Sequence, residues 1–271
     1  PGHPGGGTAR GRLYRFERGA NGVFSPASEP ALDGLKDNDN AGTGLDLDGN
    51  VLVVANPGSD AFASNGGAVH VLRRSGDGGF SQTAVIAPTE TAKDWEIGHF
   101  DAVAVWGDRI VVGATAATTK GTATGGMFVF EHRAGSWRQA ASLFPTDDPG
   151  FQTGVAACGE RVEIDGDWAW LGCPDDGRLK SKGGAVIGFL RGADGTWKWK
   201  QSITPFRQGG NLANDRFPSY LTAVGGVLSA GCADCSGKEG ALYLFQLQDG
   251  SWLQRRELRA NQPKAQDQFG Y

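Results

Sequence analysis

Several features are scarce or missing in this sequence, and each absence narrows the class of protein. No apolar run approaches the ~18 residues that a membrane-spanning helix needs, so we expect no membrane insertion. No Lys/Arg run exceeds three residues and the formal net charge is −4, which argues against nucleic-acid binding. No G-x-S-x-G, P-loop or dinucleotide-binding motif is present. His3, His70, His99 and His132 lack metal-ligand spacing, so we predict a protein that is not an enzyme and has no cofactor.

Methionine and cysteine are also scarce. The chain starts with Pro1 and has a single Met, which indicates a processed or partial product. Four cysteines, an even number, favour two disulfides in an oxidising compartment over four free thiols in a reducing one. No N-x-S/T acceptor for N-glycans occurs. We therefore expect a secreted, extracellular or cell-surface protein without N-glycans.

Glycine, in contrast, is abundant at 44 of 271 residues, and it marks an internal repeat. Glycine followed by alternating apolar residues occurs five times, in GRLYRFER, GAVHVLRR, GMFVFEHR, GAVIGFLR and GALYLFQL, which begin at Gly11, Gly67, Gly126, Gly184 and Gly240. The steps between them are 56 to 59 residues. Each run is followed by a short polar turn and an aromatic residue, a pattern typical of a β-hairpin.

A second hairpin precedes each of the last four glycine-led runs. Its segments are GLDLDGNVLVVANP, AVAVWGDRIVVGAT, RVEIDGDWAWLGCP and LTAVGGVLSAGC, with predicted turn pairs Asp48-Gly49, Trp106-Gly107, Asp165-Gly166 and Gly225-Gly226. Each repeat is therefore predicted to form four antiparallel strands. A four-stranded sheet buries both faces only by packing on its neighbours, so the repeat predicts an all-β propeller.

The phase of the repeat predicts about five blades, four complete and one split or incomplete. We expect a flexible N-terminal segment followed by a single propeller, with the following approximate limits: segment 1–10, propeller 11–271, complete blades 42–97, 98–150, 151–215 and 216–268, and the incomplete blade 11–41 with 269–271. Three interpretations of the incomplete blade stay open. The protein continues past Tyr271, a neighbouring subunit donates strands, or the ring is imperfect.

The repeat resembles the FG-GAP family, whose propeller forms the head of integrin α-subunits. DQFGY at 267–271 matches the Phe-Gly anchor of that family, IVVGAT at 110–115 and LVVANP at 52–57 match its Gly-Ala-Pro region, and GALYLF matches its last element. The segments EIGHF, RFPSY and GFQTG are degenerate anchors. The resemblance covers roughly residues 11–271 and implies an extracellular adhesive propeller.

Calcium binding is a trait of this family that the sequence supports poorly. Calcium-binding members insert an Asp-x-Asp-x-Asp-Gly loop between the first two strands of a blade. The corresponding turn here contains Asp46 and Asp48 but lacks the remaining ligands. We keep calcium at this turn only as a minor alternative to no cofactor.

The cysteines predict two disulfides. Cys158 and Cys173 lie symmetrically about the predicted Asp165-Gly166 turn, so they should face each other with Cα atoms about 5.5 Å apart. Cys232 and Cys235 remain and should pair with each other. A redox or zinc role for this C-x-x-C motif is the alternative.

Long loops gather at one end of the predicted blades, where ligands usually bind. Two tryptophans off the phase of the repeat and four acidic residues in these loops are the predicted ligand contacts: Trp95, Trp106, Asp147, Asp148, Asp175 and Asp176. For the aspartates that precede the anchors, among them Asp39, Asp215 and Asp267, capping of turns is the favoured interpretation.

These observations together predict a non-enzymatic extracellular module for adhesion or assembly. Its partners would be other proteins, including identical subunits that complement each other's strands. A carbohydrate-binding propeller with glycan partners is the alternative, and a hydrolase with its site on the propeller axis is a third hypothesis.

Overall fold

A computed structural model describes residues 2–3, 10–76, 78–119, 121–151, 157–178, 180–207 and 213–271. The chain forms two compact units, which we describe separately. Unit 1 comprises residues 1–112 and 130–139, and unit 2 comprises residues 113–129 and 140–271. The prediction that residues 11–271 form a single propeller with the stated blade limits stays a prediction.

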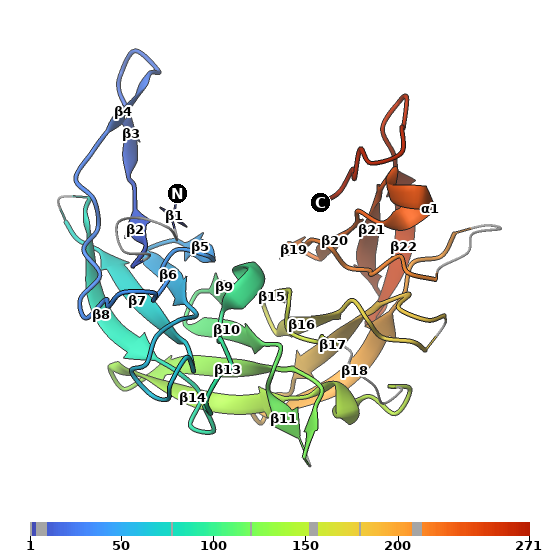
Figure 1. The fold of residues 1–271 in the computed structure, drawn as a ribbon, viewed down its shortest axis with the longest axis horizontal. Coiled ribbons are helices and arrows are strands. Elements are labelled where there is room, and N and C mark those ends of the chain that lie inside the picture. Colours follow the sequence, from blue (N-terminus) through green and yellow to red (C-terminus); the bar gives the residue numbers. More distant parts are fainter. Residues whose placement is uncertain are drawn as a thin grey trace. The chain divides into compact units, whose positions relative to one another are not determined.

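Four successive four-stranded sheets form the framework of the described chain (Figure 1). The first sheet, in unit 1, has the order β5 (Leu45–Asp48), β6 (Val51–Asn56), β7 (Ala68–Arg74), β8 (Phe80–Ile86). The second has residues in both units and contains β9 (Val103–Trp106), β10 (Arg109–Ala114), β13 (Gly126–Arg133) and β14 (Ser136–Leu143).

The third and fourth sheets lie in unit 2. Their strands are β15 (Val162–Asp165), β16 (Trp168–Cys173), β17 (Ala185–Arg191) and β18 (Trp197–Ile203), then β19 (Leu221–Val224), β20 (Val227–Cys232), β21 (Ala241–Gln248) and β22 (Ser251–Leu258). Both are antiparallel throughout. The four predicted complete repeats are thus confirmed as four-stranded sheets.

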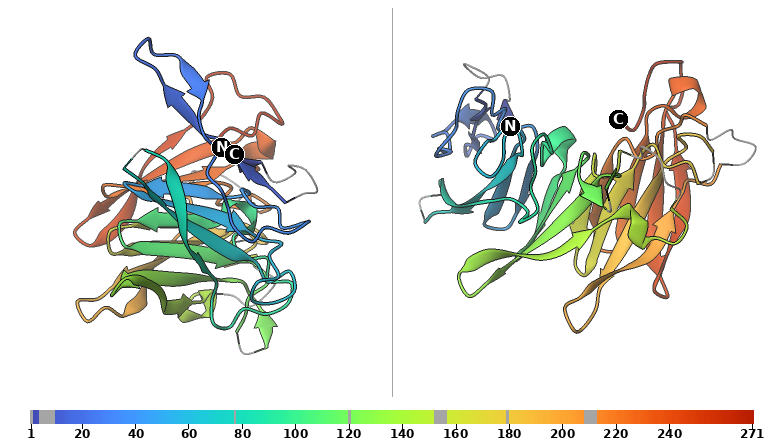
Figure 2. Two further views of the ribbon diagram at one scale, coloured as in Figure 1. Left: turned by 90° about the vertical axis from the view of Figure 1, so that its left-hand side faces the viewer. Right: turned by 60° about the horizontal axis from the view of Figure 1, so that its bottom comes forward.

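Smaller elements surround these sheets. They are β1 (Gly2–His3), β2 (Arg12–Leu13), β3 (Phe16–Arg18), β4 (Phe24–Pro26), β11 (Thr118–Thr119), β12 (Thr122–Ala123), the 3-10 turns η1 (His99–Asp101) and η2 (Pro145–Asp147), and the one-turn helix α1 (Cys235–Lys238). The hairpin of β3 and β4 projects from unit 1 (Figure 2, left). It supplies strands for the predicted incomplete blade. Within the segment predicted to be flexible, residues 2–3 pair with β2, while residues 1 and 4–9 lie outside the described part.

A glycine bridge recurs once in each repeat and explains the glycine-led pattern. The backbone of the glycine that precedes the third strand makes a parallel bridge to a residue about 30 positions on, in the pairs Gly11–Ala41, Gly67–Ile97, Gly125–Cys158, Gly184–Phe217 and Gly240–Phe269. At Gly184 the φ angle is +82°, and an added Cβ would lie 1.9 Å from the carbonyl oxygen of Phe217. Only glycine fits there, because the two backbones touch.

The turns of the first hairpins differ from the prediction by one residue in three repeats. Strand pairing joins Asp48 to Val51 and Asp165 to Trp168, so Gly49 and Gly166 are the first central residues of their turns, with φ of +53° and +62°. The predicted and the observed turn pairs both contain the same glycine, as their second and first residue respectively. The position of the glycine therefore does not distinguish between them. The prediction is confirmed only at Gly225-Gly226.

The core of unit 2 lies between its two sheets. Trp168 and Trp170 of β16 stack with ring centroids 5.1 Å apart, and Trp252 of β22 packs edge-on against Trp170 at 5.1 Å. Tyr243 and Phe245 of β21 belong to the same cluster. The cluster buries large aromatic surfaces, which supply most of the stabilising free energy between adjacent sheets.

Glutamine side chains tie the outer strands to the preceding linkers. Gln82, Gln139 and Gln254 each stand two residues after the aromatic at the first or second position of the last strand of their sheet. Their Oε1 atoms accept backbone N–H groups of Asp33, Thr89 and Phe206. In the third sheet Trp199 occupies this position. There the tie to the preceding linker is made by Ser202, whose hydroxyl donates to Asp148.

Candidate functional site

The structure buries half of the predicted ligand contacts. Trp95 is 6% exposed in unit 1, while Asp148 and Asp176 are 3% and 1% exposed in unit 2. These three residues therefore offer a ligand almost no surface, and their prediction is corrected. Trp106, the last residue of β9, is 40% exposed, and the Arg109 guanidinium lies 5.3 Å from its ring centroid.

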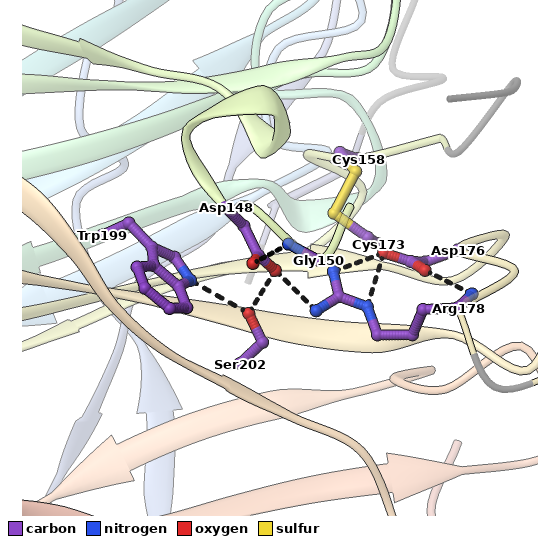
Figure 3. Close-up of polar contacts among 8 residues, drawn as sticks. All are labelled: Asp148, Gly150, Cys158, Cys173, Asp176, Arg178, Trp199 and Ser202. Atoms are coloured by element: carbon purple, nitrogen blue, oxygen red, sulfur yellow. Dashed lines mark hydrogen bonds and ion pairs between the residues drawn. A yellow bond between two sulfur atoms is a disulfide. The ribbon is translucent and has the colours of Figure 1, made fainter. Parts of the chain in front are cut away.

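Asp148 and Asp176 are held by one buried arginine (Figure 3). The Arg178 guanidinium lies 2.5 Å from Asp148 Oδ2 through Nη1 and 2.6 Å from Asp176 Oδ2 through Nη2. Ser202 donates its hydroxyl to Asp148 and accepts the Trp199 indole N–H at 3.1 Å. The cluster joins two loops of unit 2 to β18, so its carboxylates serve the fold. Asp148 and Arg178 are 30 residues apart in the sequence, so no local pattern showed that this aspartate is buried in an ion pair.

Turn-capping is confirmed for three of the aspartates that precede the anchors, whereas the Asp215 carboxylate forms an ion pair with Arg207 Nη2 at 3.1 Å. Asp39, Asp147 and Asp267 each accept the backbone N–H of the residue three positions earlier, at 2.9, 3.0 and 2.8 Å. Asp175 instead forms ion pairs with Arg216 at 3.0 Å and Lys182 at 4.0 Å. Ligand contact by Asp147 or Asp175 stays a prediction.

Both predicted disulfides are present, Cys158–Cys173 and Cys232–Cys235. The first joins Cα atoms 4.0 Å apart, closer than expected. The regular pairing of β15 with β16 would not place these cysteines opposite each other. They meet because the pairing becomes irregular before β15, where the Gly159 N–H donates to the Gly172 carbonyl and the Gly172 N–H donates to the Arg161 carbonyl. The disulfides indicate an exported protein.

The two aspartates considered as calcium ligands, Asp46 and Asp48, use their carboxylates to bind backbone N–H groups. Asp46 accepts the backbone N–H of Val105 at 2.7 Å and Asp48 that of Gly107 at 2.6 Å, so both carboxylates bind the next sheet. Burial raises the pKa of the Asp46 carboxyl. In the described chain one group, Asp215 with Cys232 and Cys235, has metal-ligating atoms within 4.8 Å of one another. Both of its sulfurs are oxidised to the disulfide and offer no thiolate.

A polar pocket of about 430 Å³ lies in unit 1, and we name it the His99 pocket. Its lining comes from the segment before β5, the loop after β6 and the turn before β9: Asn38, Asn40, Thr43, Pro57, Gly58, Asn65, Glu96 and His99. The volume suits a small ligand. Glu96 and His99 are the ionisable side chains among its described lining residues.

Glu96 and His99 form a carboxylate–imidazole pair in this pocket. Glu96 Oε2 lies 2.9 Å from His99 Nδ1, and the imidazole stacks on the Phe100 ring with centroids 4.0 Å apart. Gly98, with φ of +80°, forms the turn that returns the chain so that these side chains meet. A carboxylate on Nδ1 selects the tautomer whose Nε2 lone pair is available as a base.

Hydrogen-bonding groups surround the pair. Thr43 Oγ1 is buried in the pocket wall and has no hydrogen-bond partner within the described ranges, so its hydroxyl is left unsatisfied. Asn38, Asn40 and Asn65 have left-handed backbones, with φ of +69°, +57° and +48°. Asparagine adopts this conformation at low cost and brings an amide that donates and accepts. The arrangement can hold a hydroxyl-rich molecule against a histidine base.

This site was not predicted from the sequence. EIGHF was interpreted only as a degenerate anchor, and His99 was set aside with the other histidines because they lack metal-ligand spacing. The usable signal was a Glu and a His three residues apart across Gly98, because a turn at that glycine brings the two side chains together.

Comparisons with known proteins identify the fold but not a family. No family model and no curated protein matches the chain. Among solved structures, a protein from Lactobacillus plantarum is 13% identical, with a TM-score of 0.51 over 90% of this chain and 64% of its own. The periplasmic gluconolactonase PpgL of Pseudomonas aeruginosa is 20% identical, with a TM-score of 0.51 over 93% of this chain and 64% of its own. The chain thus spans about two thirds of the length of each.

The comparisons correct the predicted function. We expected a protein that is not an enzyme, an adhesive module with a carbohydrate-binding module as alternative, and the likeness to an enzyme contradicts that expectation. Adhesion and filament assembly find no support. The FG-GAP resemblance stays a prediction, as do the protein and glycan partners. In the part of the chain that the structure describes, no helix is long and apolar enough to cross a membrane. The predicted fold class is confirmed, because the chain is an all-β propeller of four-stranded antiparallel blades.

Proposed function

We propose that this protein is a hydrolase that opens the ring of a sugar lactone in the His99 pocket. One observation carries the proposal: Glu96 Oε2 lies 2.9 Å from His99 Nδ1 in a pocket whose wall holds the unpartnered Thr43 hydroxyl. The likeness to a gluconolactonase suggests the substrate class, a neutral lactone with several hydroxyl groups. Activity in the extracellular medium or at the cell surface agrees with the disulfides.

The reaction adds one water molecule to the lactone. His99 Nε2 takes a proton from water while the water oxygen attacks the carbonyl carbon, and Glu96 stabilises the imidazolium that forms. The carbonyl oxygen becomes an oxyanion that accepts hydrogen bonds from the Thr43 hydroxyl and an asparagine amide. The ring C–O bond then breaks, and the imidazolium proton passes to the leaving alkoxide. The product is a hydroxy acid.

The other lining groups fit this substrate. Three asparagines line the pocket, and their amides pair with adjacent hydroxyls of a sugar ring, donating to one and accepting from the next. Glu96 and His99 are the ionisable residues of the described lining and they pair with each other, so a neutral substrate meets no unpaired charge. The pocket volume of about 430 Å³ accommodates a six-membered lactone.

Proton release from D-glucono-1,5-lactone, corrected for spontaneous hydrolysis, tests the proposal. We expect His99→Gln to lower kcat at least about 100-fold, because a general base contributes that much or more. Glu96→Gln should lower kcat less, since it only weakens the orientation of the imidazole. The matched control is His132→Gln, whose imidazole packs on Trp137 with ring centroids 5.1 Å apart and does not line the pocket.

The outcomes separate the proposal from its rivals. Equal activity of wild type and His99→Gln on every neutral lactone tried would sink the assignment of the base. No turnover above the spontaneous rate, with gluconolactone or simpler lactones, would exclude lactone hydrolysis altogether. Thermal unfolding of each variant shows whether an inactive protein is still folded.

A further inference from the structure

A second and larger pocket lies in unit 2, with a volume of about 880 Å³. We name it the arginine pocket. It is lined by five cationic side chains and two acidic ones, together with small polar residues: Lys182, Arg207, Arg216, Lys238, Arg259, Asp215, Asp234, Ala213, Asn214, Ser236 and Gly237. Cations therefore outnumber acids in the lining, which is unlike the His99 pocket.

Two arginines converge on one hydroxyl in this pocket. Arg207 Nη1 donates to Ser236 Oγ at 3.2 Å, and Arg259 Nη1 donates to the same oxygen at 2.8 Å. Arg207 follows β18 and Arg259 follows β22, so two successive linkers supply them. A neutral hydroxyl is a weak partner for two guanidinium groups, because a guanidinium forms a hydrogen bond about twice as strong with an anionic oxygen.

The arginines are fixed in place by ion pairs on their outer sides. Arg207 Nη2 lies 3.1 Å from Asp215 Oδ2, with both side chains buried, and Arg259 Nη2 lies 2.5 Å from Glu257 Oε1. The pairs with Asp215 and Glu257 use other nitrogens than those that reach Ser236, whereas Arg259 Nη1 also lies 3.7 Å from Glu239 Oε2. A guanidinium has five N–H donors, so each arginine serves its ion pair and still donates into the pocket.

Asp215 and Asp234 are the acids that an incoming anion would meet in the lining. The Asp215 carboxylate is already engaged by Arg207, and burial raises its pKa while the Arg207 charge opposes that rise. The ion pair with Arg207 reduces the repulsion between Asp215 and an anion. Lys182 and Lys238 add exposed positive charge at the pocket lining.

The backbone at Ser236 is held in a strained shape by the second disulfide. Ser236 has φ of +55° and ψ of +42°, the left-handed region that a serine adopts only at a cost. Cys235, the residue before it, is fully buried and bonded to Cys232. The Lys238 N–H also donates to the Asp234 carbonyl at 3.3 Å. The point at which the arginines meet is therefore preorganised.

We propose that the arginine pocket binds the phosphate or sulfate group of a small molecule, with an anionic oxygen taking the place of the Ser236 hydroxyl between Arg207 and Arg259. The two Nη1 atoms bind that oxygen, and Lys182 and Lys238 neutralise the remaining charge. This site is separate from the proposed lactone hydrolysis and does not depend on it.

Isothermal titration with inorganic phosphate and with sulfate tests the proposal. We expect saturable binding with Kd below about 1 mM. Arg207→Gln and Arg259→Gln should each weaken it about tenfold or more, because each removes a charge-assisted hydrogen bond. Arg255→Gln is the matched control, since Arg255 is exposed on β22 and bonds only to Gln248 among the contacts of its side chain described here. It should change Kd by less than about twofold.

Two further variants make the result decisive. Ser236→Ala removes the hydroxyl that both Nη1 atoms reach and should bind phosphate as tightly as wild type or more tightly, and a loss of binding in this variant contradicts the proposal. Lys238→Gln, at an exposed position, should weaken binding without affecting folding. If Arg207→Gln or Arg259→Gln fails to fold, the test then depends on Lys238→Gln.

Sugar esters identify the source of the anion. Tighter binding of glucose 6-phosphate or glucose 6-sulfate than of the inorganic ions supports an esterified ligand, and equal binding supports the free ion. Glucose itself should not bind here. No saturable binding of any of these anions, or equal weakening by Arg255→Gln and Arg207→Gln, overturns the proposal.

Discussion

The glycine bridge yields a prediction whose size follows directly from the structure. Gly184→Ala places a Cβ 1.9 Å from Phe217 O and 2.5 Å from Phe217 N, whereas real Cβ contacts lie beyond about 3.0 Å. Phe217 is fully buried in the core of unit 2, so the two backbones separate only by disturbing that core. Alanine also pays for the left-handed φ of +82°.

A matched control separates the two costs. Gly225 has φ of +58° in a turn, and an added Cβ there meets nothing within 4 Å. Gly225→Ala should therefore lower the free energy of unfolding by about 1 kcal/mol, the cost of the left-handed backbone alone. Gly184→Ala carries the same cost and breaks the bridge, so we expect a loss of about 4 kcal/mol, in the range reserved for severe core disruption.

Urea unfolding followed by tryptophan fluorescence measures both variants. The slope of free energy against urea should stay unchanged, so that the shift in midpoint reports stability. A difference of about 3 kcal/mol between the variants supports the close approach of the two backbones. Equal losses would refute it and, with it, our explanation of why glycine opens each repeat.

Four other perturbations have defined outcomes. Replacing Cys158 and Cys173 by serine opens a disulfide with a sequence separation of 15 and should cost about 3 kcal/mol in urea unfolding, whereas no loss would remove its structural role. Burial lowers the pKa of His70 below 6.5, so its contribution to stability is present above that pH and is lost as the pH falls; His70→Gln should flatten the acid limb of stability against pH, and an unchanged limb would contradict this. Arg178→Met leaves two buried carboxylates unpaired and should cost about 3 kcal/mol, measurable as a large drop in Tm, and an unchanged Tm would count against the cluster as a tie. Gln254→Ala removes two hydrogen bonds to a linker and should cost about 1 kcal/mol in the same urea assay, and a neutral effect would show that solvent replaces them.

Repetition made most of the fold predictable from the sequence. Five glycine-led runs in phase were enough to predict the four-stranded unit, because any sheet of this kind must meet its neighbour in the same way each time. Local turn chemistry was less reliable. Asp165-Gly166 looked like a turn pair, but the turn centres on Gly166 and the following residue, and both arrangements satisfy the same preference for glycine.

The candidate sites depended on contacts that no local pattern encodes. Asp148 and Asp176 looked like exposed loop acids until Arg178, 30 residues from Asp148, was found between them. Trp95 looked like a surface aromatic but is buried. The function was mispredicted because the prediction followed the repeat pattern, and a repeat pattern carries information about packing. The Glu96–His99 pair lies at a turn outside that pattern.

Histidine-selective NMR offers the most direct test of the central claim, that a sugar-derived lactone is bound and hydrolysed at His99. The chain has four histidines, so their imidazole signals can be assigned by single substitutions. Titration with D-gluconate, the hydrolysis product of gluconolactone, should shift the His99 signals saturably and leave those of His132 in place. Unmoved His99 signals at a concentration that inhibits turnover would contradict the account.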